Sequence, residues 1–155
     1  MNMTEGLDMI DNYQSILVPV DGSEEAEAAL KKAIQITLRN GENSKLHIVH
    51  VIDTRSFQNV SDFQSTMYDQ VAASARETLE TYLKEAKDAG VARAEYSIEF
   101  GAPKSVIADV APKKYGSELI VIGATGLNAV ERLLIGSVTE YVVRNAKVDV
   151  LVAKS

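Results

Sequence analysis

Residues 15–23 read SILVPVDGS, and this stretch decides the fold. Its first part, Ser15–Val20, is apolar on both faces of an extended chain, which is typical of a central strand in a parallel sheet. A turn, Asp21-Gly22-Ser23, follows. Acidic side chains then gather where the positive end of a helix dipole favours them, at Glu24, Glu25 and Glu27. The stretch therefore predicts a strand that leads through a tight turn into a helix.

The same alternation of short apolar runs and longer amphipathic stretches continues along the chain. The first helix is expected to end at Asn40-Gly41. Further strands are expected at Lys45–Ile52, Ala94–Phe100, Leu119–Ile122 and Val148–Ala153, and further helices at Ser65–Ala89, from Pro103 onward and at Ser137–Asn145. Right-handed crossovers then predict an α/β three-layer sandwich around a five-stranded parallel sheet. The two strands that are apolar on both faces belong side by side in its middle, which gives the order 3-2-1-4-5.

Three local features carry expectations of their own. Pro112 is expected to end or kink the helix that begins at Pro103, about one residue before the proline. Residues 53–64 show no clean periodicity and are interpreted as a loop or lid. Phe57, Phe63 and Tyr68 are interpreted as packing residues rather than as a platform for stacking a base.

Composition limits the class of protein and its partners. The 155 residues fit one domain, expected over 14–155, with 1–13 as a flexible N-terminal extension. The net charge of −6 argues against general affinity for nucleic acid or for anionic membranes. The chain has no cysteine, no apolar run long enough for a membrane span, and a polar, acidic start without a basic region. We therefore expect a cytoplasmic protein with neither disulfides nor thiolate metal sites.

The strongest functional motif follows the fourth strand. It reads Gly123-Ala124-Thr125-Gly126, then nine residues, then Gly136-Ser137-Val138-Thr139. In open α/β sheets, ligands bind at the carboxyl ends of the strands where the winding direction reverses, here between strands 1 and 4. A site is therefore expected to draw on Pro19–Ser23 and on the chain from Gly123 onward. Because Gly136 precedes a helix, the amides and hydroxyls after it would be free donors for a phosphate.

This motif resembles the nucleotide-binding signature of universal stress proteins, in the branch that binds ATP. The resemblance extends from about Gln14 to Ala153 and includes the opening run through Ser23 and the ending Gly136–Ala146. It implies an adenine nucleotide alpha hydrolase-like fold, a role in stress response or signalling, and bound ATP or another adenine nucleotide with Mg or Mn. It also implies a homodimer formed through the last strand, 148–153.

The resemblance further implies which residues bind the nucleotide. Asp21 would contact the nucleoside beside Pro19 and Val20, and main-chain groups at Val49, His50 and Val51 would hold the adenine edge. The ribose and phosphates would lie along the glycine loop, at Gly123, Ala124, Gly126, Gly136, Ser137, Val138 and Thr139. No catalytic or metal-ligating residue is assigned.

Several residues of this region also have a structural interpretation. Gly123 and Gly126 would also suit a tight turn between strand and helix. Asp21 or Ser23 would also suit the N-cap of the first helix. His47 and His50, which we place on one face of their strand, are interpreted as packing or surface residues rather than as a metal pair, because no further ligands lie at suitable spacing.

Two other classes of function remain as alternatives. An ATP hydrolase or phosphotransferase would need a positioned cation and a charge-neutralising Lys or Arg. Here Gly136 is followed by Ser137 instead of the lysine of a P-loop, and Arg132 is the only basic residue of the loop, so at most slow hydrolysis is expected. A flavodoxin-like electron-transfer or receiver domain is a minor alternative, because strand 3 ends in Phe100-Gly101-Ala102 without a phosphorylatable Asp.

Overall fold

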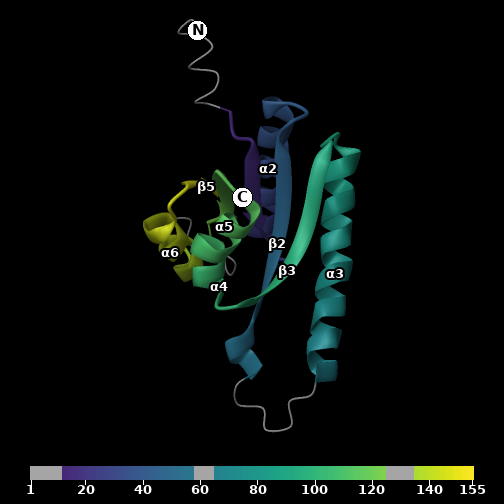
Figure 1. The fold of residues 1–155 in the computed structure, drawn as a ribbon, viewed down its shortest axis with the longest axis vertical. Helices are drawn as coiled ribbons and strands as arrows, with labels where there is room; N and C mark the ends of the chain where they lie inside the picture. Colours follow the sequence, from purple (N-terminus) through teal and green to yellow (C-terminus); the bar gives the residue numbers. More distant parts are fainter. Residues whose placement is uncertain (1–11, 58–64, 125–134) are drawn as a thin grey trace, which may run out of the picture.

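The computed structural model of the chain describes residues 12–57, 65–124 and 135–155. Strands and helices alternate along the chain, as the sequence predicts (Figure 1). The strands are β1 (Ser15–Pro19), β2 (Lys45–Asp53), β3 (Arg93–Gly101), β4 (Leu119–Gly123) and β5 (Asp149–Ala153). The helices are α2 (Glu24–Asn40), α3 (Ser65–Asp88), α4 (Pro103–Ser105), α5 (Ala111–Tyr115) and α6 (Ser137–Asn145), with a 3-10 turn η1 (Thr54–Phe57) and a π turn η2 (Val106–Val110).

All five strands form one parallel sheet in the order β3-β2-β1-β4-β5. Both the architecture and the strand order predicted from the sequence are confirmed. The central strand β1 pairs with β2 on one side and with β4 on the other. The connections therefore wind in opposite directions from β1 and from β4, so that the carboxyl ends of these two strands lie beside the reversal.

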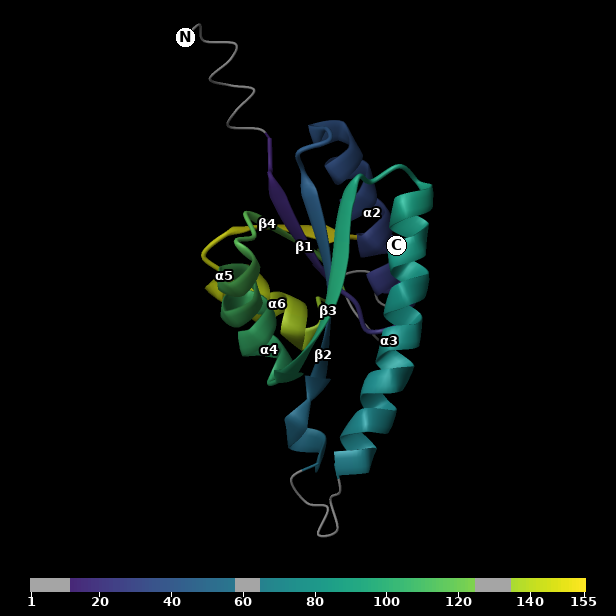
Figure 2. The same cartoon turned by 45° about the vertical axis from the view of Figure 1, so that its right-hand side comes forward.

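Helices cover both faces of this sheet, which makes the three layers seen in Figure 2. On one face, α2 and α3 bury apolar side chains against β1, β2 and β4, with Leu30, Leu46, Ile48 and Leu79 almost fully buried. On the other face, η2, α5 and α6 pack against a second core around Leu17, Val49 and Ile120. Because β1 and β4 contribute to both cores, they have to be apolar on both faces.

The helical segment after β3 shows what happens at Pro112, where the sequence predicts that the helix ends or kinks. Pro112 does not end the helix, since helical turns continue from Pro103 to Tyr115. The turn before the proline is instead widened: the amide of Ala111 donates to the carbonyl of Val106, five residues back. A proline lacks the N–H of a regular helical bond, and its ring clashes with the carbonyl four residues earlier. The π turn removes that conflict without breaking the helix.

The segment interpreted as a loop or lid is partly regular. β2 continues to Asp53, and a 3-10 turn follows over Thr54–Phe57. The rest of the segment, with Phe63, lies outside the described residues, as does the side chain of Phe57. The ring of Tyr68 meets that of Phe100 edge to face with centroids 5.7 Å apart, in agreement with its interpretation as a packing residue.

Candidate functional site

A cavity of about 400 Å³ opens at the carboxyl edge of the sheet, where β1 and β4 end. The described parts of the fold that build it are the end of β1, the first turn of α2, β2, the helical segment after β3, the end of β4 and the start of α6. The described residues that line it are Pro19, Val20, Asp21, Ser23, Glu25, Ala26, Val51, Pro103, Ile107, Ile122, Gly123, Gly136, Ser137, Val138 and Thr139. The cavity therefore lies where the winding direction of the sheet reverses, which is the position expected for a ligand site.

The N-terminus of α6 forms one wall of this cavity. Gly136 is its N-cap, with extended backbone angles of φ −61° and ψ 157° and no capping side chain. The amide of Gly136 donates to the carbonyl of Ala124 at 2.8 Å, so this donor is already used. The next three amides, at Ser137, Val138 and Thr139, belong to the first turn, where a helix offers no acceptor. They line the cavity at the positive end of the helix dipole and form a site suited to an anion.

The Thr139 hydroxyl has a structural role. Its Oγ1 donates to the carbonyl of Gly123 at 2.7 Å, and the side chain is buried. A hydroxyl has only one proton to donate, so this one is not available to a ligand. The hydrogen bond instead ties the start of α6 to the end of β4. The backbone amides are therefore the donors that Thr139 and its neighbours bring to the site.

Gly123 has a packing role that the sequence did not reveal. A Cβ added to it would lie 2.6 Å from the carbonyl oxygen of Glu25 and 2.8 Å from the carbonyl carbon. Both are backbone atoms of α2, which cannot move without shifting the helix. The missing side chain thus lets the first turn of α2 approach the end of β4. This close approach brings Glu25 to the cavity.

In the turn after β1, Asp21 and Ser23 have different structural roles. Ser23 Oγ accepts the amide of Ala26 at 3.1 Å and is therefore the N-cap of α2. One carboxylate oxygen of Asp21, Oδ1, accepts the amide of Ser23 at 3.0 Å, and Gly22 between them has a positive φ of 84°. Of the two candidates for the cap, Ser23 holds the position. The exposed Asp21 lines the cavity and keeps its second oxygen for other partners.

The structure brings most of the expected residues together, but not all of them. Val49 has a fully buried side chain, and its carbonyl accepts the amide of Val20 at 2.8 Å. Ala124 uses its amide on the carbonyl of Ala153 and its carbonyl on Gly136. Neither residue lines the cavity, and Gly126 lies outside the described residues, as does Arg132.

His50 lies at a different cavity. This second cavity, of about 420 Å³, lies between α3 and the ends of β1 and β2, and is lined by Val20, Asp21, Gly22, His50, Gln70, Val71, Ser74, Ala75, Thr78 and Leu79. The Nδ1 of His50 donates to the carbonyl of Val20 at 2.8 Å, because a carbonyl can only accept. The backbone of Val20 and Asp21 thus separates two cavities on opposite faces of the sheet.

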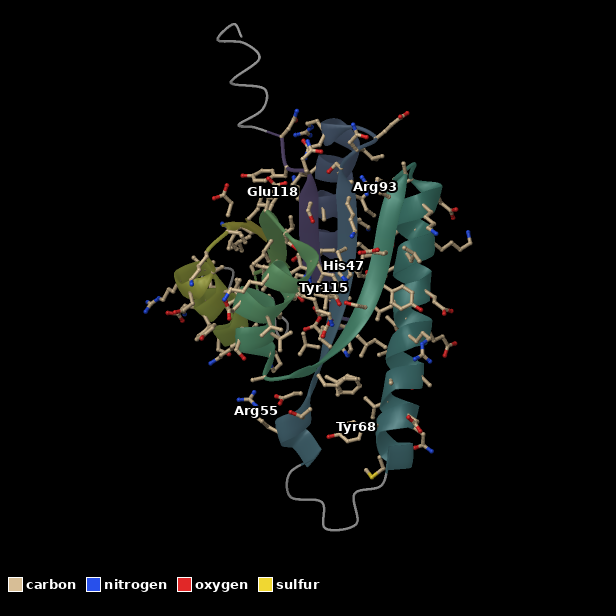
Figure 3. The ribbon with its side chains drawn as sticks, in the orientation of Figure 1. His47, Arg55, Tyr68, Arg93, Tyr115 and Glu118 are labelled. Carbon is tan, nitrogen blue, oxygen red and sulfur yellow. The ribbon has the colours of Figure 1, made fainter. Side chains whose placement is uncertain are left out.

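The two histidines of β2 do not share a face, contrary to our expectation. They are three residues apart, and side chains alternate along a strand, so His47 points to the opposite face from His50. His47 is buried, with Nδ1 2.9 Å from Glu95 Oε1 and Nε2 2.7 Å from Ser97 Oγ. Its ring stacks on that of Tyr115 with centroids 3.7 Å apart, and Figure 3 shows the two side by side. Burial lowers the pKa of His47, against the opposing effect of Glu95.

Several residues of the cavity were missed by sequence reasoning. Pro103 and Ile107 come from the helical segment between β3 and β4, and Ile122 from β4 itself. A crossover helix begins at the carboxyl edge of the sheet, so the position of Pro103 at the start of such a helix was a usable signal. The sequence gives no such signal for Glu25 and Ala26, because they reach the cavity only through the close contact of α2 with Gly123.

The described residues form neither a cluster of metal ligands nor a membrane-spanning helix. No group of three or more His, Cys, Asp and Glu side chains is arranged to hold a metal ion in the described parts of the chain. Among the helices that the structure describes, none combines the length and apolar character that crossing a bilayer requires.

Comparison with known proteins agrees with this geometry. A putative universal stress protein of Staphylococcus haemolyticus is 41% identical over 143 residues, which cover 92% of this chain and 86% of the relative. The solved universal stress protein UspA of Lactobacillus plantarum is 32% identical with a TM-score of 0.76, over 92% of this chain and 98% of that one. A universal stress protein solved in complex with cAMP is 28% identical with a TM-score of 0.65, over 92% and 97%. The model of the universal stress protein family matches residues 12–154, and this chain belongs to that family.

Proposed function

We propose that this protein is a nucleotide-binding module that takes an adenine nucleotide, ATP foremost, into the cavity at the carboxyl edge of the sheet. The observation that carries the proposal is the first turn of α6, whose residues Ser137, Val138 and Thr139 line the cavity and whose amides have no helical acceptor. Such amides bind phosphate without a basic side chain, in keeping with the net charge of −6. A related universal stress protein binds cAMP, which also joins adenine to a phosphate.

The rest of the cavity suits a nucleoside. Val51, Ile107 and Ile122 give it an apolar wall, against which a flat base would be shielded from water. Asp21 lines the same cavity, and carboxylates commonly accept the hydroxyls of a ribose. We therefore propose that the base packs near Val51, that Asp21 contacts the sugar, and that the phosphate tail extends to Ser137.

A divalent cation fits the donors of this cavity. Asp21 and Glu25 supply carboxylate oxygens, the ligand type that Mg²⁺ and Mn²⁺ prefer, and no lysine or arginine in the described part of the chain lines the same space. When bound, such a cation would neutralise charge on the phosphates. The residues of this chain would orient the nucleotide and hold its tail. We propose binding rather than phosphoryl transfer as the function, with the nucleotide state as the signal in stress response.

Replacing Gly136 with valine tests this proposal. The backbone angles of Gly136 are open to any residue, so the fold should tolerate the change. The new side chain would cover the amides behind it and should weaken ATP binding at least about tenfold. A tenfold loss of affinity corresponds to about 1.4 kcal/mol of binding free energy. Isothermal titration calorimetry of ATP with and without Mg²⁺ measures the effect.

The matched control puts the same side chain at the other end of the same helix. Asn145→Val lies on the exposed last turn of α6, so it should bind ATP like the unmodified protein. Unchanged ATP affinity in a folded Gly136→Val protein would refute the placement of the phosphates.

A further inference from the structure

A buried histidine of β2 joins a carboxylate and a hydroxyl of β3 in one chain of hydrogen bonds. His47 Nδ1 lies 2.9 Å from Glu95 Oε1, and its Nε2 lies 2.7 Å from Ser97 Oγ. An ionised carboxylate can only accept, so Nδ1 carries the ring proton and Nε2 accepts the hydroxyl of Ser97. Carboxylate, imidazole and hydroxyl follow one another here in the order by which serine hydrolases activate their nucleophile.

The register of the sheet explains why these three side chains meet. His47 pairs with Glu95 across the two strands, and Ser97 lies two residues further along β3. Side chains of paired residues, and of residues two apart on one strand, point to the same face of a sheet. Paired strands hold such groups more precisely than loops do. The arrangement is therefore a rigid part of the fold.

The surroundings of this network keep it in the form that a general base requires. The ring of Tyr115 stacks on that of His47 with centroids 3.7 Å apart and 22° between the planes, which restricts rotation of the imidazole (Figure 3). Lys45 Nζ lies 2.7 Å from Glu95 Oε1 and holds the pKa of this carboxyl below its ordinary value. Burial lowers the pKa of His47, so the ring is neutral at neutral pH and able to take a proton.

Ser97 is a member of the network that a reagent can reach. The residue is partly exposed, and β3 is an edge strand of the sheet. The side chain of Glu95 is 45% exposed, whereas that of His47 is 2% exposed. A neutral acceptor would satisfy Nδ1 of a purely structural histidine. An ionised carboxylate also stabilises the imidazolium that forms when the ring takes a proton.

We propose that Ser97 is an activated nucleophile that accepts acyl groups, with His47 as its general base and Glu95 as the residue that positions and stabilises the imidazole. This activity is independent of the proposed nucleotide binding. Activated esters are the expected substrate class, because an ester with a good leaving group needs the least further stabilisation from the protein.

The acyl transfer uses His47 to move one proton. Ser97 Oγ forms a bond to the acyl carbon while its proton moves to His47 Nε2. The bond from that carbon to the ester oxygen then breaks, and the leaving alcohol takes the proton from Nε2. The products are an acyl ester of Ser97 and a free alcohol, and His47 returns to its neutral form. Water then releases the acyl group as a carboxylic acid through the same proton transfers.

Reaction with p-nitrophenyl acetate near neutral pH tests this proposal, with peptide mass spectrometry to locate the acetyl group. In the unmodified protein, Ser97 should be acetylated at least about a hundredfold faster than Ser74, an exposed serine of α3. The matched control Ser74→Ala should react like the unmodified protein. Ser97→Ala should lose the adduct, and His47→Gln should slow its formation about a hundredfold or more. Circular dichroism checks that each variant is folded.

Glu95→Gln separates activation from a purely structural role of the network. The amide oxygen of glutamine still accepts the Nδ1 proton, but glutamine lacks the charge that favours the imidazolium. The acetylation rate should follow the neutral form of His47, so it should rise with pH and level off above the pKa of that ring. Because Glu95 raises the pKa of His47, the midpoint of this profile should move to lower pH in Glu95→Gln, and the plateau should fall at least about tenfold. The other titratable groups around the ring are the same in this variant: Lys45, Glu99, Lys114 and Tyr115.

Two results would overturn the proposal. Acetylation of Ser97 no faster than that of Ser74 would show that its hydroxyl is not activated. Equal rates at Ser97 in the unmodified protein and in folded Glu95→Gln, with the same midpoint of the pH profile, would show that the hydrogen-bonded network takes no part in the reaction. The second result decides the question even if His47→Gln does not fold.

Discussion

His47 is a buried residue whose protonation links the stability of the fold to pH. Its Nδ1 donates to Glu95, which leaves Nε2 to accept the hydroxyl of Ser97, so the neutral ring satisfies both partners. Burial lowers its pKa below the ordinary value of 6.5. Glu95 and Glu99 face the same ring, and the pKa of each is lowered, with Lys45 and Lys114 as their cationic partners. Protonating His47 in the folded protein is therefore unfavourable.

This gives a prediction for stability against pH. Below about pH 6.5 the unfolded chain binds a proton at this histidine more readily than the folded one, so stability falls as the pH drops. Above that pH, His47 contributes no pH dependence, and the contributions of Glu95 and Glu99 are lost only at lower pH, below about 4.5. Urea unfolding between pH 7.5 and 5 measures the slope, which His47→Gln should reduce. NMR titration of the His47 ring, if it gave a pKa above 6.5, would contradict this account.

At the residue scale, the sequence predicted which residues belong to the site better than it predicted where each side chain points. It named Asp21, Gly136 and Ser137 for the site, and all three line one cavity. It did not separate Ser23 from Asp21 as the cap, because either side chain can accept the same amide. Main-chain groups of His50 were assigned to the adenine edge; its side chain lies on the other face of the sheet, at the second cavity. Whether main-chain atoms of Val49 and His50 touch a base is still a prediction.

At the element scale, periodicity located every strand and the long helices to within about two residues, the usual uncertainty of a boundary. The exception was the helical segment around Pro112. Proline removes one hydrogen bond, and the sequence does not say whether the chain stops or widens into a π turn. The apolar residues Val106, Ile107 and Ala108 pack on the second core and hold the widened turn in place.

The close packing of α2 on β4 is also a property of elements rather than of single residues. Gly123 was predicted for a ligand or a turn, and it lines the cavity. The structure also shows that its missing side chain admits the backbone of Glu25. Such an approach depends on the angle at which a helix crosses the sheet, which no local pattern encodes. For this reason, Glu25 and Ala26 were absent from the predicted site although they line the cavity.

At the scale of the whole molecule, the sheet has two edges, and β5 is one of them. Its residues Val150, Leu151 and Val152 are only partly buried, and an exposed edge strand favours pairing with another strand. We therefore predict a homodimer in which β5 pairs with its copy, as the family resemblance implies. Sedimentation equilibrium at micromolar concentration should give twice the chain mass of 16.8 kDa.

A double variant gives this dimer prediction a control. Val150→Lys with Val152→Lys would place like charges opposite one another across the paired strands, which is destabilising. The variant should lower the mass towards that of one chain while keeping the helical content by circular dichroism. A strictly monomeric mass for the unmodified protein would count against the pairing.

The fold as a whole could be predicted because strands that are apolar on both faces have few places in a sheet. β1 and β4 had to lie in its middle, and the reversal between them then gave the position of the site. The ligand could not be predicted with the same certainty. A phosphate needs only amides, which any sequence supplies, so the identity of the nucleotide depends on the shape of the cavity.

A crystal structure of the protein grown with ATP and Mg²⁺ is the most direct test of the central claim. The account predicts phosphate oxygens within about 3 Å of the amides of Ser137, Val138 and Thr139, with the base on the side of Val51. A nucleotide whose phosphates lie elsewhere, or a first turn of α6 capped by the protein's own side chains in the presence of saturating ATP, would contradict it.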